Sequence, residues 1–475
     1  MTSSFLEATP VNSPLNPNSL FISDLLSGTD FSFLDFYSKS DELAAELPRG
    51  LVILLAKNRL FFTTAYAASL RSHNPVLVLD SDISANALRL IVKAFEPAGI
   101  VSDNFDNPLS WKRKRLSLNG FFYKNPAHVE FEIYDQLATL MPTSGSTGSP
   151  KCVRVSYDNI LTSTSAIGEF LQMRAGRKLI TSLPLHYTYG LSLLHLAMLY
   201  GLPLVLTEKS ALTDEFWNET IDNDVTDFSG VPVQYDFLIR RGIDSRALDQ
   251  LACMTQAGGS LHSSKTRHFL ELSQKHDFDF FTMYGQTEAT PRISFVPPSI
   301  GLSKLGSVGM AIPGGKLSIE SDSSHRSNDA RQAGEVVYSG KNVCLGYART
   351  FEDLSKGDEL LGVLRTGDCG YLDEDGFLFL TGRLGREIKV SGKRVNLDSA
   401  QSSISHLDLD LALVGKEDLI VVLIVGEEVH EVRALLAKEA SLHPSMIQVM
   451  QVEKIPRLSS GKVDYASLND TYLSS

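Results

Sequence analysis

The segment Thr143-Ser144-Gly145-Ser146-Thr147-Gly148-Ser149-Pro150-Lys151 places hydroxyls, glycines and one lysine between an apolar run at residues 137–141 and a strand-like run at 152–155. Glycine tolerates a positive φ, so such a loop can close tightly around an anion. Hydroxyl and freed backbone N–H groups then donate to phosphate oxygens, and a lysine supplies a point charge. We therefore interpret the segment as a phosphate-binding loop for a nucleoside triphosphate.

This loop differs from the Walker loop, whose G-x-x-x-x-G-K-[ST] pattern opens a helix. Here Gly145 and Gly148 stand too close together, and Pro150 precedes Lys151. Taken alone, the segment is also compatible with a flexible Ser/Gly turn between two strands. The choice between the two interpretations depends on the rest of the chain.

Length and composition are those of a globular protein with more than one structural unit. The chain has 475 residues, of which 43% are hydrophobic and 21% charged, a size and balance typical of a multidomain enzyme. A net charge of −12 argues against general nucleic-acid binding, which needs a basic surface. The four cysteines are scattered without a C-x-x-C pair, so we expect neither a disulfide framework nor a zinc site.

The N-terminal segment is rich in Ser, Pro and Asn and lacks a basic region followed by an apolar core, so it does not read as a signal peptide. The longest apolar runs, at residues 51–56 and 419–425, are too short to span a bilayer. Together with the scattered cysteines, these features predict a cytoplasmic protein with no membrane span.

Strand-like and helix-like segments alternate from residue 51 to residue 283. Buried-strand runs at 51–55 and 75–79 flank a helix-like stretch at 59–72. This alternation predicts a body of βαβ units. The further predicted helices are 83–95, 158–173, 191–200, 213–223, 233–240 and 263–276, and the further strands are 100–101, 178–182, 203–206, 227–229, 251–256 and 279–283.

The pattern of apolar and polar residues changes after residue 305. Segments from Gly306 to Leu380 are short, alternating and punctuated by Gly, Asp and Ser, which predicts a β-rich subdomain. Beyond Arg383 the chain reads as a strand pair, an apolar strand at 420–425, a helix at 429–440 and a polar tail. We therefore predict the α/β class, with a large N-terminal body of α/β subdomains plus a β-rich subdomain at 1–383. A small, mobile α+β C-terminal domain is predicted at 384–475.

Four further motifs accompany the loop. They are Tyr284-Gly285-Gln286-Thr287-Glu288; Arg365-Thr366-Gly367-Asp368 with the later Thr381-Gly382-Arg383; Ile388-Lys389-Val390-Ser391-Gly392-Lys393-Arg394-Val395; and Pro456-Arg457-Leu458-Ser459-Ser460-Gly461-Lys462-Val463-Asp464. The first follows a predicted strand that ends at Met283, so it lies at a carboxyl edge where α/β sheets bind ligands. In the order of all five motifs the chain resembles the adenylate-forming superfamily of acyl- and aryl-CoA synthetases, luciferases and peptide-synthetase adenylation domains. The resemblance extends from about Leu51 to the end of the chain.

The resemblance implies an AMP-forming carboxylate ligase. ATP and Mg²⁺ would convert a carboxylic acid into an acyl-adenylate and pyrophosphate, and the acyl group would pass to the thiol of CoA or of a carrier-protein pantetheine. Lys462 and Thr287 would act on the reacting groups, and Glu288 would hold Mg²⁺. The nucleotide would contact Thr143, Ser144, Gly145, Ser146, Thr147, Gly148, Lys151, Gly258, Tyr284, Asp368 and Arg383. The acid pocket would comprise His186, Tyr187, Tyr189, Ser229, Gly230, Val231 and Gly258, and Lys389 with Gly392 would line the thiol path.

Each of these residues also has an ordinary explanation when it is considered alone. Asp368 can cap a turn, Glu288 can begin a helix and Lys462 can be a solvated surface charge. Tyrosines such as Tyr187 can simply pack beneath a sheet edge. The joint occurrence of the five motifs favours the functional interpretation.

The chain departs from the family pattern at the hinge, where Gly385 and Arg386 follow Gly382-Arg383-Leu384 in place of an acidic residue. No Asp or Glu stands near Tyr189 to meet the ammonium group of an amino acid. A small or medium organic acid therefore fits better than an amino acid or a long fatty chain. CoA and a carrier protein remain alternative acceptors, a non-catalytic relative that binds nucleotide is a further alternative, and the protein is expected to be a monomer or a homodimer.

Overall fold

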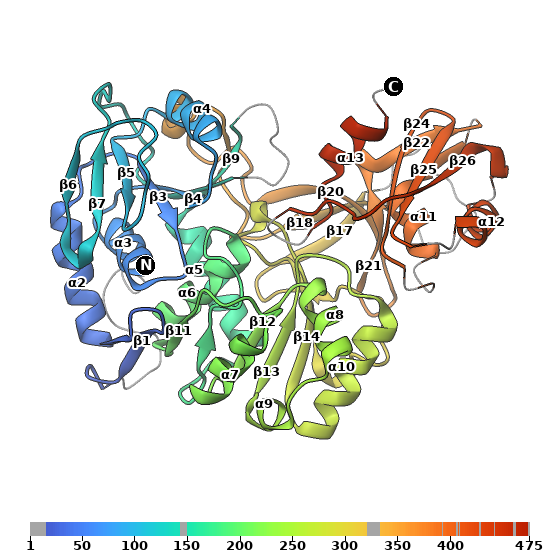
Figure 1. Ribbon diagram of the computed structural model, residues 1–475, viewed down its shortest axis with the longest axis horizontal. Coiled ribbons are helices and arrows are strands. Elements are labelled where there is room, and N and C mark those ends of the chain that lie inside the picture. Colours follow the sequence, from blue (N-terminus) through green and yellow to red (C-terminus); the bar gives the residue numbers. More distant parts are fainter. Residues whose placement is uncertain are drawn as a thin grey trace.

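The computed structural model describes residues 16–142, 150–320, 333–391, 393–404, 407, 409–426, 429–440, 442–458 and 462–473. Two large sheets and their covering helices form the body, and a four-stranded sheet and a C-terminal module follow (Figure 1). This architecture confirms the predicted α/β class. No helix within the described ranges is long and apolar enough to cross a membrane.

The first large sheet has the strand order β19-β9-β8-β4-β3-β5-β7-β6. All five residues of β3 are buried, as expected for a parallel strand covered on both faces. The strands are β3 (Val52–Ala56), β4 (Val76–Asp80), β5 (Gly99–Ser102), β6 (Arg113–Arg115), β7 (Phe121–Lys124), β8 (Leu137–Pro142), β9 (Cys152–Ser156) and β19 (Gly346–Ala348). Strand β19 comes from far along the chain and pairs antiparallel with β9.

The predicted phosphate loop connects two neighbouring strands of this sheet. Strands β8 and β9 pair antiparallel, with Pro142 opposite Cys152, so residues 143–151 link their adjacent ends. Residues 143–149, and with them the predicted phosphate contacts of Thr143, Ser144, Gly145, Ser146, Thr147 and Gly148, lie outside the described residues. Lys151 is described and is half-buried.

The second large sheet has the order β16-β15-β14-β13-β12-β10-β11-β1-β2. Its strands are β1 (Leu20–Asp24), β2 (Thr29–Ser32), β10 (Leu179–Ile180), β11 (Leu204–Leu206), β12 (Asp227–Gly230), β13 (Cys253–Gln256), β14 (Asp279–Tyr284), β15 (Ser294–Val296) and β16 (Met310–Ala311). Strands β12, β13 and β14 are adjacent and parallel. The segments that follow Gly230, Gln256 and Tyr284 therefore meet at one edge of the sheet.

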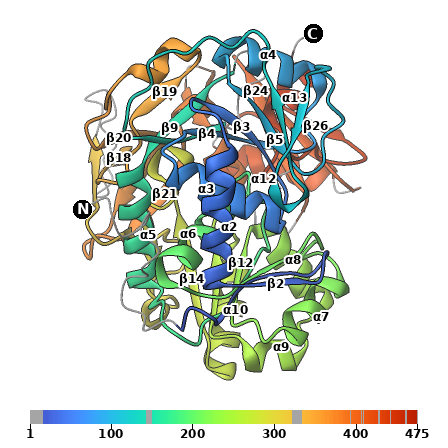
Figure 2. The same ribbon diagram turned by 90° about the vertical axis from the view of Figure 1, so that its left-hand side faces the viewer.

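Helices cover both large sheets. They are α2 (Phe33–Glu46), α3 (Leu60–Arg71), α4 (Ala85–Phe95), α5 (Tyr157–Phe170), α6 (Thr188–Tyr200), α7 (Asp214–Asp222), α8 (Pro232–Arg241), α9 (Ser245–Gln250) and α10 (Ser263–His276). Figure 2 shows α2 and α3 side by side on one flank of the body. Short 3₁₀ turns lie at Ser117–Asn119, Thr287–Ala289, Pro298–Ile300, Phe351–Ser355 and Pro444–Met446.

The structure corrects the sequence analysis at several places in the body, among them β6, β7 and α9, which were not predicted. No element was predicted before residue 51, yet β1, β2 and α2 form there, and a capping box between Ser32 and Asp35 starts α2. Helix α6 begins at Thr188 rather than at residue 191 because Tyr187, in an extended conformation, already accepts a hydrogen bond from the Leu191 N–H. Thr188 and Tyr189 consequently belong to the first turn of a buried helix.

The C-terminal third begins with an antiparallel sheet of order β17-β18-β20-β21. Its strands are β17 (Lys316–Glu320), β18 (Gly334–Ser339), β20 (Val363–Leu372) and β21 (Leu378–Arg383), which agrees with the predicted β-rich subdomain. A 3₁₀ turn at Leu384–Arg386 then leads to β22 (Glu387–Val390), β23 (Lys393–Asn396), α11 (Leu397–Ser403), β24 (Leu411–Lys416), β25 (Leu419–Ile424), α12 (Val429–Glu439), β26 (Ile447–Gln451) and α13 (Tyr465–Tyr472). The tail, which was predicted only to be polar, contains the helix α13.

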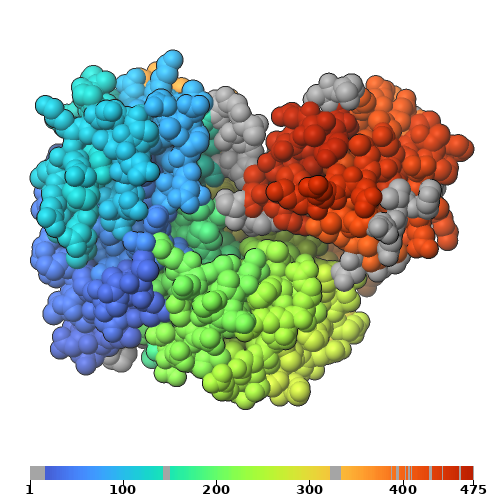
Figure 3. Space-filling model, viewed as in Figure 1, coloured from blue at the N-terminus to red at the C-terminus, as the bar shows by residue number. Residues whose placement is uncertain are grey.

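Residues from Ile388 onward, termed here the C-terminal module, form two apolar clusters of their own. One is centred on buried residues of β24 and β25, and the other includes Leu468 of α13. Figure 3 shows this orange and red module beside the green and yellow lobe, with a notch between it and the blue lobe. The boundary at 383/384 and the mobility of the module stay predictions.

Candidate active site

Three predicted nucleotide-binding residues form one polar cluster. Tyr284 ends β14, Asp368 lies in β20 and Arg383 ends β21. The Tyr284 hydroxyl donates to Asp368 Oδ2 at 2.5 Å, and Arg383 Nε donates to Asp368 Oδ1 at 2.8 Å. Asp368 is only 4% exposed, while burial and the neighbouring carboxylate raise the pKa of Tyr284 and keep it a donor. The cluster therefore presents a fixed, buried carboxylate beside an aromatic ring.

A second cluster joins the predicted metal ligand to the phosphate loop. The Tyr347 hydroxyl, from β19, donates to Glu288 Oε1 at 3.0 Å. The Lys151 ammonium lies 3.5 Å from the centre of the same Tyr347 ring, a cation–π distance. Pairing of β19 with β9 places Tyr347 opposite Val153 and so beside the end of the loop. Tyr347 thus holds one oxygen of Glu288 and supports Lys151.

Lys462 lies within electrostatic range of both clusters. Burial lowers the pKa of its ammonium, Arg383 lowers it further, and the carboxylates of Asp368 and Glu288 act in the opposite direction. The Lys462 side chain still keeps solvent-exposed surface, as expected for a group at the mouth of a site. Thr287, between the two clusters in sequence, has its Oγ1 atom 3.5 Å from that of Thr188 at the start of α6.

The predicted acid-pocket residues come from three elements that meet at the carboxyl edge. The Tyr189 hydroxyl lies 2.8 Å from Thr255 Oγ1, and Ser229 Oγ lies 2.8 Å from the same atom. Gly258 has a φ of +83°, and a Cβ at this position would lie 3.1 Å from a methyl group of Val231. The structure thus brings Tyr189, Ser229, Gly230, Val231 and Gly258 together as one wall.

His186 and Tyr187 precede this wall. Their rings lie 4.3 Å apart, and His186 Nε2 is buried without a hydrogen bond, 3.5 Å from Asp80 Oδ2. Burial lowers the pKa of His186, whereas the negative charges of Asp80 and Asp82 raise it. A Cβ on Gly190 would lie 2.2 Å from the carbonyl oxygen of Pro184, so the tight turn into α6 requires glycine.

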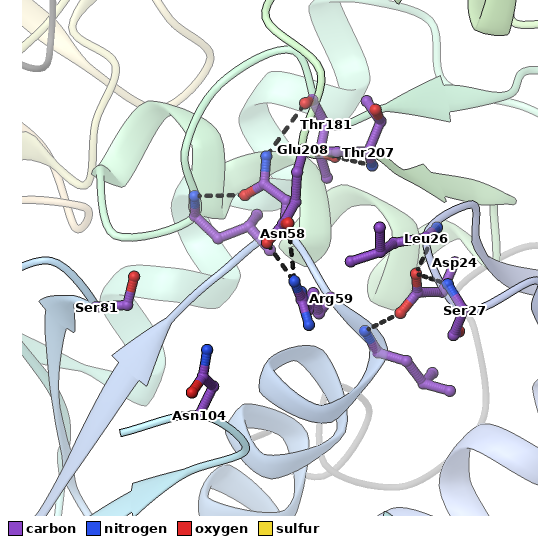
Figure 4. Close-up of polar contacts among 12 residues, drawn as sticks. Asp24, Leu26, Ser27, Asn58, Arg59, Ser81, Asn104, Thr181, Thr207 and Glu208 are labelled. Carbon is purple, nitrogen blue, oxygen red and sulfur yellow. Dashed lines mark hydrogen bonds and ion pairs between the residues drawn. The ribbon is translucent and has the colours of Figure 1, made fainter. Parts of the chain in front are cut away.

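Asn58, which the sequence analysis did not single out, fixes the backbone leading to His186. Its amide nitrogen donates to the carbonyl oxygens of Thr181 and Leu183 at 3.2 Å each, and its amide oxygen accepts from the Leu185 N–H at 3.1 Å (Figure 4). The adjacent Arg59 makes a two-pronged ion pair with Glu208 at 2.8 and 2.9 Å. This junction ties the first large sheet to the second directly in front of the acid pocket.

Two arginines flank the expected hinge. Arg383 pairs with Asp368 of the four-stranded sheet, and Arg386 pairs with Asp398 of the C-terminal module at 2.5 Å. Between them Leu384 is 43% exposed, and a Cβ on Gly385 would meet nothing within 4 Å. The replacement of the family's acidic residue therefore gives a sparsely packed connection with an anchored arginine at each end.

Of the two thiol-path residues, the structure describes only Lys389. Lys389 lies exposed on β22, and within the described ranges its side chain contacts neither Asp368 nor Glu288. Gly392 lies outside the described residues. In the described part of the chain, no group of three His, Cys, Asp or Glu side chains is placed to hold a metal ion. Glu288 is therefore suited to a metal ion that takes its other ligands from bound phosphates and water.

Comparison with known proteins identifies the family. A sequence model described as AMP-binding enzyme matches residues 15–348, which is most of the chain. The chain belongs to the AMP-binding enzyme family. The match starts well before residue 51 and so includes β1, β2 and α2, in agreement with their place in the fold.

Two curated relatives of this AMP-binding enzyme carry the same name. The 2-succinylbenzoate–CoA ligase of Oceanobacillus iheyensis is 32% identical over 268 residues, covering 56% of this chain and 54% of the relative. The ligase of the same name from Bacillus velezensis is 28% identical over 355 residues, covering 72% of this chain and 71% of the relative. The chain thus matches about half of the first relative's length and more of the second.

Solved structures of the fold align over nearly the whole chain. The o-succinylbenzoate CoA synthetase of Bacillus subtilis, in complex with its acyl-adenylate intermediate, has a TM-score of 0.76 at 22% identity, covering 98% of each chain. ATP-bound MatB from Rhodopseudomonas palustris has a TM-score of 0.79 at 20% identity, covering 100% of this chain and 99% of that one. These likenesses establish the adenylate-forming fold.

Proposed function

We propose that this AMP-binding enzyme activates a carboxylic acid with ATP and transfers the acyl group to CoA. The observation that carries the proposal is the gathering of Tyr284, Asp368 and Arg383 beside Glu288, with Lys462 in electrostatic range of both carboxylates. Family membership and relatives named as CoA ligases support the same reaction class. In the first step the carboxylate oxygen attacks the α-phosphorus and pyrophosphate leaves.

Each residue has a physical role in that step. Asp368 accepts hydrogen bonds from the ribose hydroxyls, while the Tyr284 ring stacks on adenine and Gly258 brings backbone close to it. Thr287 donates to the α-phosphate, and Lys151 with residues 143–148 contacts the β- and γ-phosphates. Glu288 holds Mg²⁺, which offsets phosphate charge when bound. Lys462 neutralises the repulsion between the attacking carboxylate and the α-phosphate.

Thioester formation completes the proposed reaction. The CoA thiol, as its thiolate, attacks the acyl carbonyl carbon, and AMP leaves. We propose that residues 384–475 turn about Leu384–Gly385 between the two steps, so that Lys389 and Gly392 replace Lys462 beside the acyl-adenylate. The sparse packing around Gly385 supports this alternation, because a backbone turn there breaks few contacts.

The acid is proposed to be small or medium in size, with its body against Tyr189 and Ser229. The compound to test first is 2-succinylbenzoate, since the relatives carry its name. Loading of a carrier-protein pantetheine is the alternative second step. A comparison of thioester yield with CoA and with a holo carrier protein distinguishes the two acceptors.

The test of the first step is carboxylate-dependent ATP–pyrophosphate exchange. Lys462→Ala is expected to abolish exchange but to spare acyl transfer from supplied acyl-adenylate, because Lys462 acts on the carboxylate and the α-phosphate while the adenylate forms. Lys454→Ala, an exposed lysine of the same module, is the matched control and should retain both activities. Full exchange activity in Lys462→Ala would remove this residue from its role.

A further inference from the structure

Arg292 is a buried cation without an anionic partner. It follows the Tyr284–Glu288 motif and is only 3% exposed. Its guanidinium lies 4.0 Å from the centre of the Tyr189 ring, and its Nε donates to Met283 Sδ at 3.3 Å. Within the described residues no Asp or Glu side chain pairs with it. Arginine stays protonated in proteins, so an unpaired guanidinium in this position destabilises the unliganded fold.

Arg292 also lines an internal cavity whose walls carry hydroxyl groups. The cavity lies between helices α5 and α6 and strands β12 and β13, and its polar lining includes the hydroxyl residues Ser192, Ser229 and Thr255. Asp227 also lines the cavity, but Arg177 already pairs with both of its carboxylate oxygens. The remaining lining is apolar and comprises Ile167, Leu171, Met173, Leu179, Leu193, Leu196 and Phe228.

This cavity adjoins the proposed adenylation site. Ser229 and Tyr189 belong to the acid-pocket wall. The Tyr189 hydroxyl bonds to the Thr255 hydroxyl, and the Arg292 guanidinium stacks on the ring of the same tyrosine. A Cβ on Gly285 would lie 2.9 Å from Arg292 Cα, so the backbone of Arg292 packs against the Tyr284–Glu288 motif. If the reacting carboxylate lies beside Thr287 and the body of the acid lies against the wall, the far end of the acid comes near the Tyr189 ring, on which the Arg292 guanidinium stacks.

We propose that Arg292 selects acids that carry a second anionic group, a carboxylate remote from the one that is adenylated. The planar guanidinium matches a carboxylate in geometry, and the Ser229 hydroxyl, which lies 2.8 Å from Thr255 Oγ1, lines the same cavity. The substrate class is then a dicarboxylic acid with an apolar or aromatic body, which suits the apolar lining. This inference rests on the proposed adenylation chemistry and names the class of acid that it serves.

Matched pairs of acids test the inference in ATP–pyrophosphate exchange. The pairs are 2-succinylbenzoate with 4-oxo-4-phenylbutanoate, phthalate with benzoate, and glutarate with butyrate, each differing by one carboxylate. The native protein is expected to prefer the dianion of at least one pair by on the order of 100-fold in kcat/KM, the effect of a hydrogen-bonded charge pair. Arg292→Met should abolish that preference through a loss of turnover with the dianion, while Arg292→Lys should restore part of it.

A second measurement separates selection from a structural role. Without ligand, Arg292→Met is expected to unfold at the same temperature as the native protein or higher, because it removes an unpaired buried charge. The preferred dianion should raise the unfolding temperature of the native protein but not that of Arg292→Met. Arg174→Met, which removes an exposed charge next to Met173, controls for a general electrostatic effect and should behave as the native protein does.

The outcomes distinguish the two proposals. Absence of exchange with every acid, mono- or dianionic, would overturn the adenylation function and the inference with it. Exchange without a dianion preference, or a preference that survives Arg292→Met, would overturn the role of Arg292 alone. A lowered unfolding temperature of unliganded Arg292→Met would assign the cation to fold stability instead.

Discussion

Replacement of Asn58 by alanine tests how the acid pocket is held in place. The side chain makes three hydrogen bonds to backbone groups of residues 181–185. At about 1 kcal/mol for each bond, Asn58→Ala should lower the free energy of unfolding by about 3 kcal/mol. The freed segment leads to His186 and Tyr187, so we also expect the KM for the acid to rise about tenfold, the cost of a modest misplacement.

Asn58→Asp adds a second test, because it keeps the shape of the side chain. Its carboxylate would face the carbonyl oxygens of Thr181 and Leu183, which now lie 3.2 Å from the amide nitrogen, while the Leu185 bond survives. Repulsion should make this variant less stable than Asn58→Ala at neutral pH.

Urea unfolding and exchange kinetics measure the two effects of Asn58. Asn104→Ala is the matched control, since Asn104 lies near Asn58 in Figure 4 with an exposed side chain that makes none of these bonds. Equal unfolding midpoints for Asn58→Ala and Asn104→Ala would refute the bond-by-bond reasoning. An unchanged KM at lowered stability would confine Asn58 to a structural role.

Three further variants probe other parts of the molecule. Tyr347→Phe removes the 3.0 Å bond to Glu288 and should weaken Mg²⁺ binding, seen as a roughly tenfold higher Mg²⁺ requirement in exchange; an unchanged requirement would show that the contact does not support the metal ligand. Asp227→Asn leaves Arg177 buried without its partner and should cost about 3–5 kcal/mol of stability in urea unfolding, whereas a loss below about 1 kcal/mol would show that the pair behaves like an exposed one. Burial lowers the pKa of His195 from 6.5 to about 3. Between these two pH values the unfolded state binds a proton at His195 that the folded state does not bind. The free energy of unfolding should therefore fall as the pH decreases from 6.5 to about 3, by up to about 1.4 kcal/mol per pH unit from this group. His195→Gln should flatten that slope in pH-dependent unfolding, and an unchanged slope would assign it to other groups.

The sequence allowed the central fold to be predicted because local patterns there agree with long-range packing. Strand β3 reads as a continuous apolar run and is buried throughout, as parallel strands are. The placement of Thr287 and Glu288 at a carboxyl edge followed from the strand that ends before them, and β12, β13 and β14 form that edge.

Other features depend on strand pairings and side-chain contacts that no local sequence pattern predicts. Tyr347 lies on a three-residue strand, too short to show alternation, and is 59 residues from the Glu288 that it contacts. Strand β1 joins the second large sheet through β11, far along the chain. Arg292 and Asn58 are ordinary polar residues in sequence; their significance comes from a missing partner in one case and three backbone partners in the other.

The pairing of β19 with β9 also determines when the body can be completed during synthesis. Buried Arg154 on β9 donates to the carbonyl oxygen of Leu345, which lies 191 residues later in the chain. At roughly 5–20 residues per second, a ribosome needs on the order of 10 to 40 seconds to synthesise the chain from Arg154 to Leu345. During that interval the outer edge of β9 has no neighbouring strand, and the unpaired backbone groups of such an edge can pair with strands of other chains. The nascent chain therefore passes through a stage at which this edge of β9 is open to pairing with other strands.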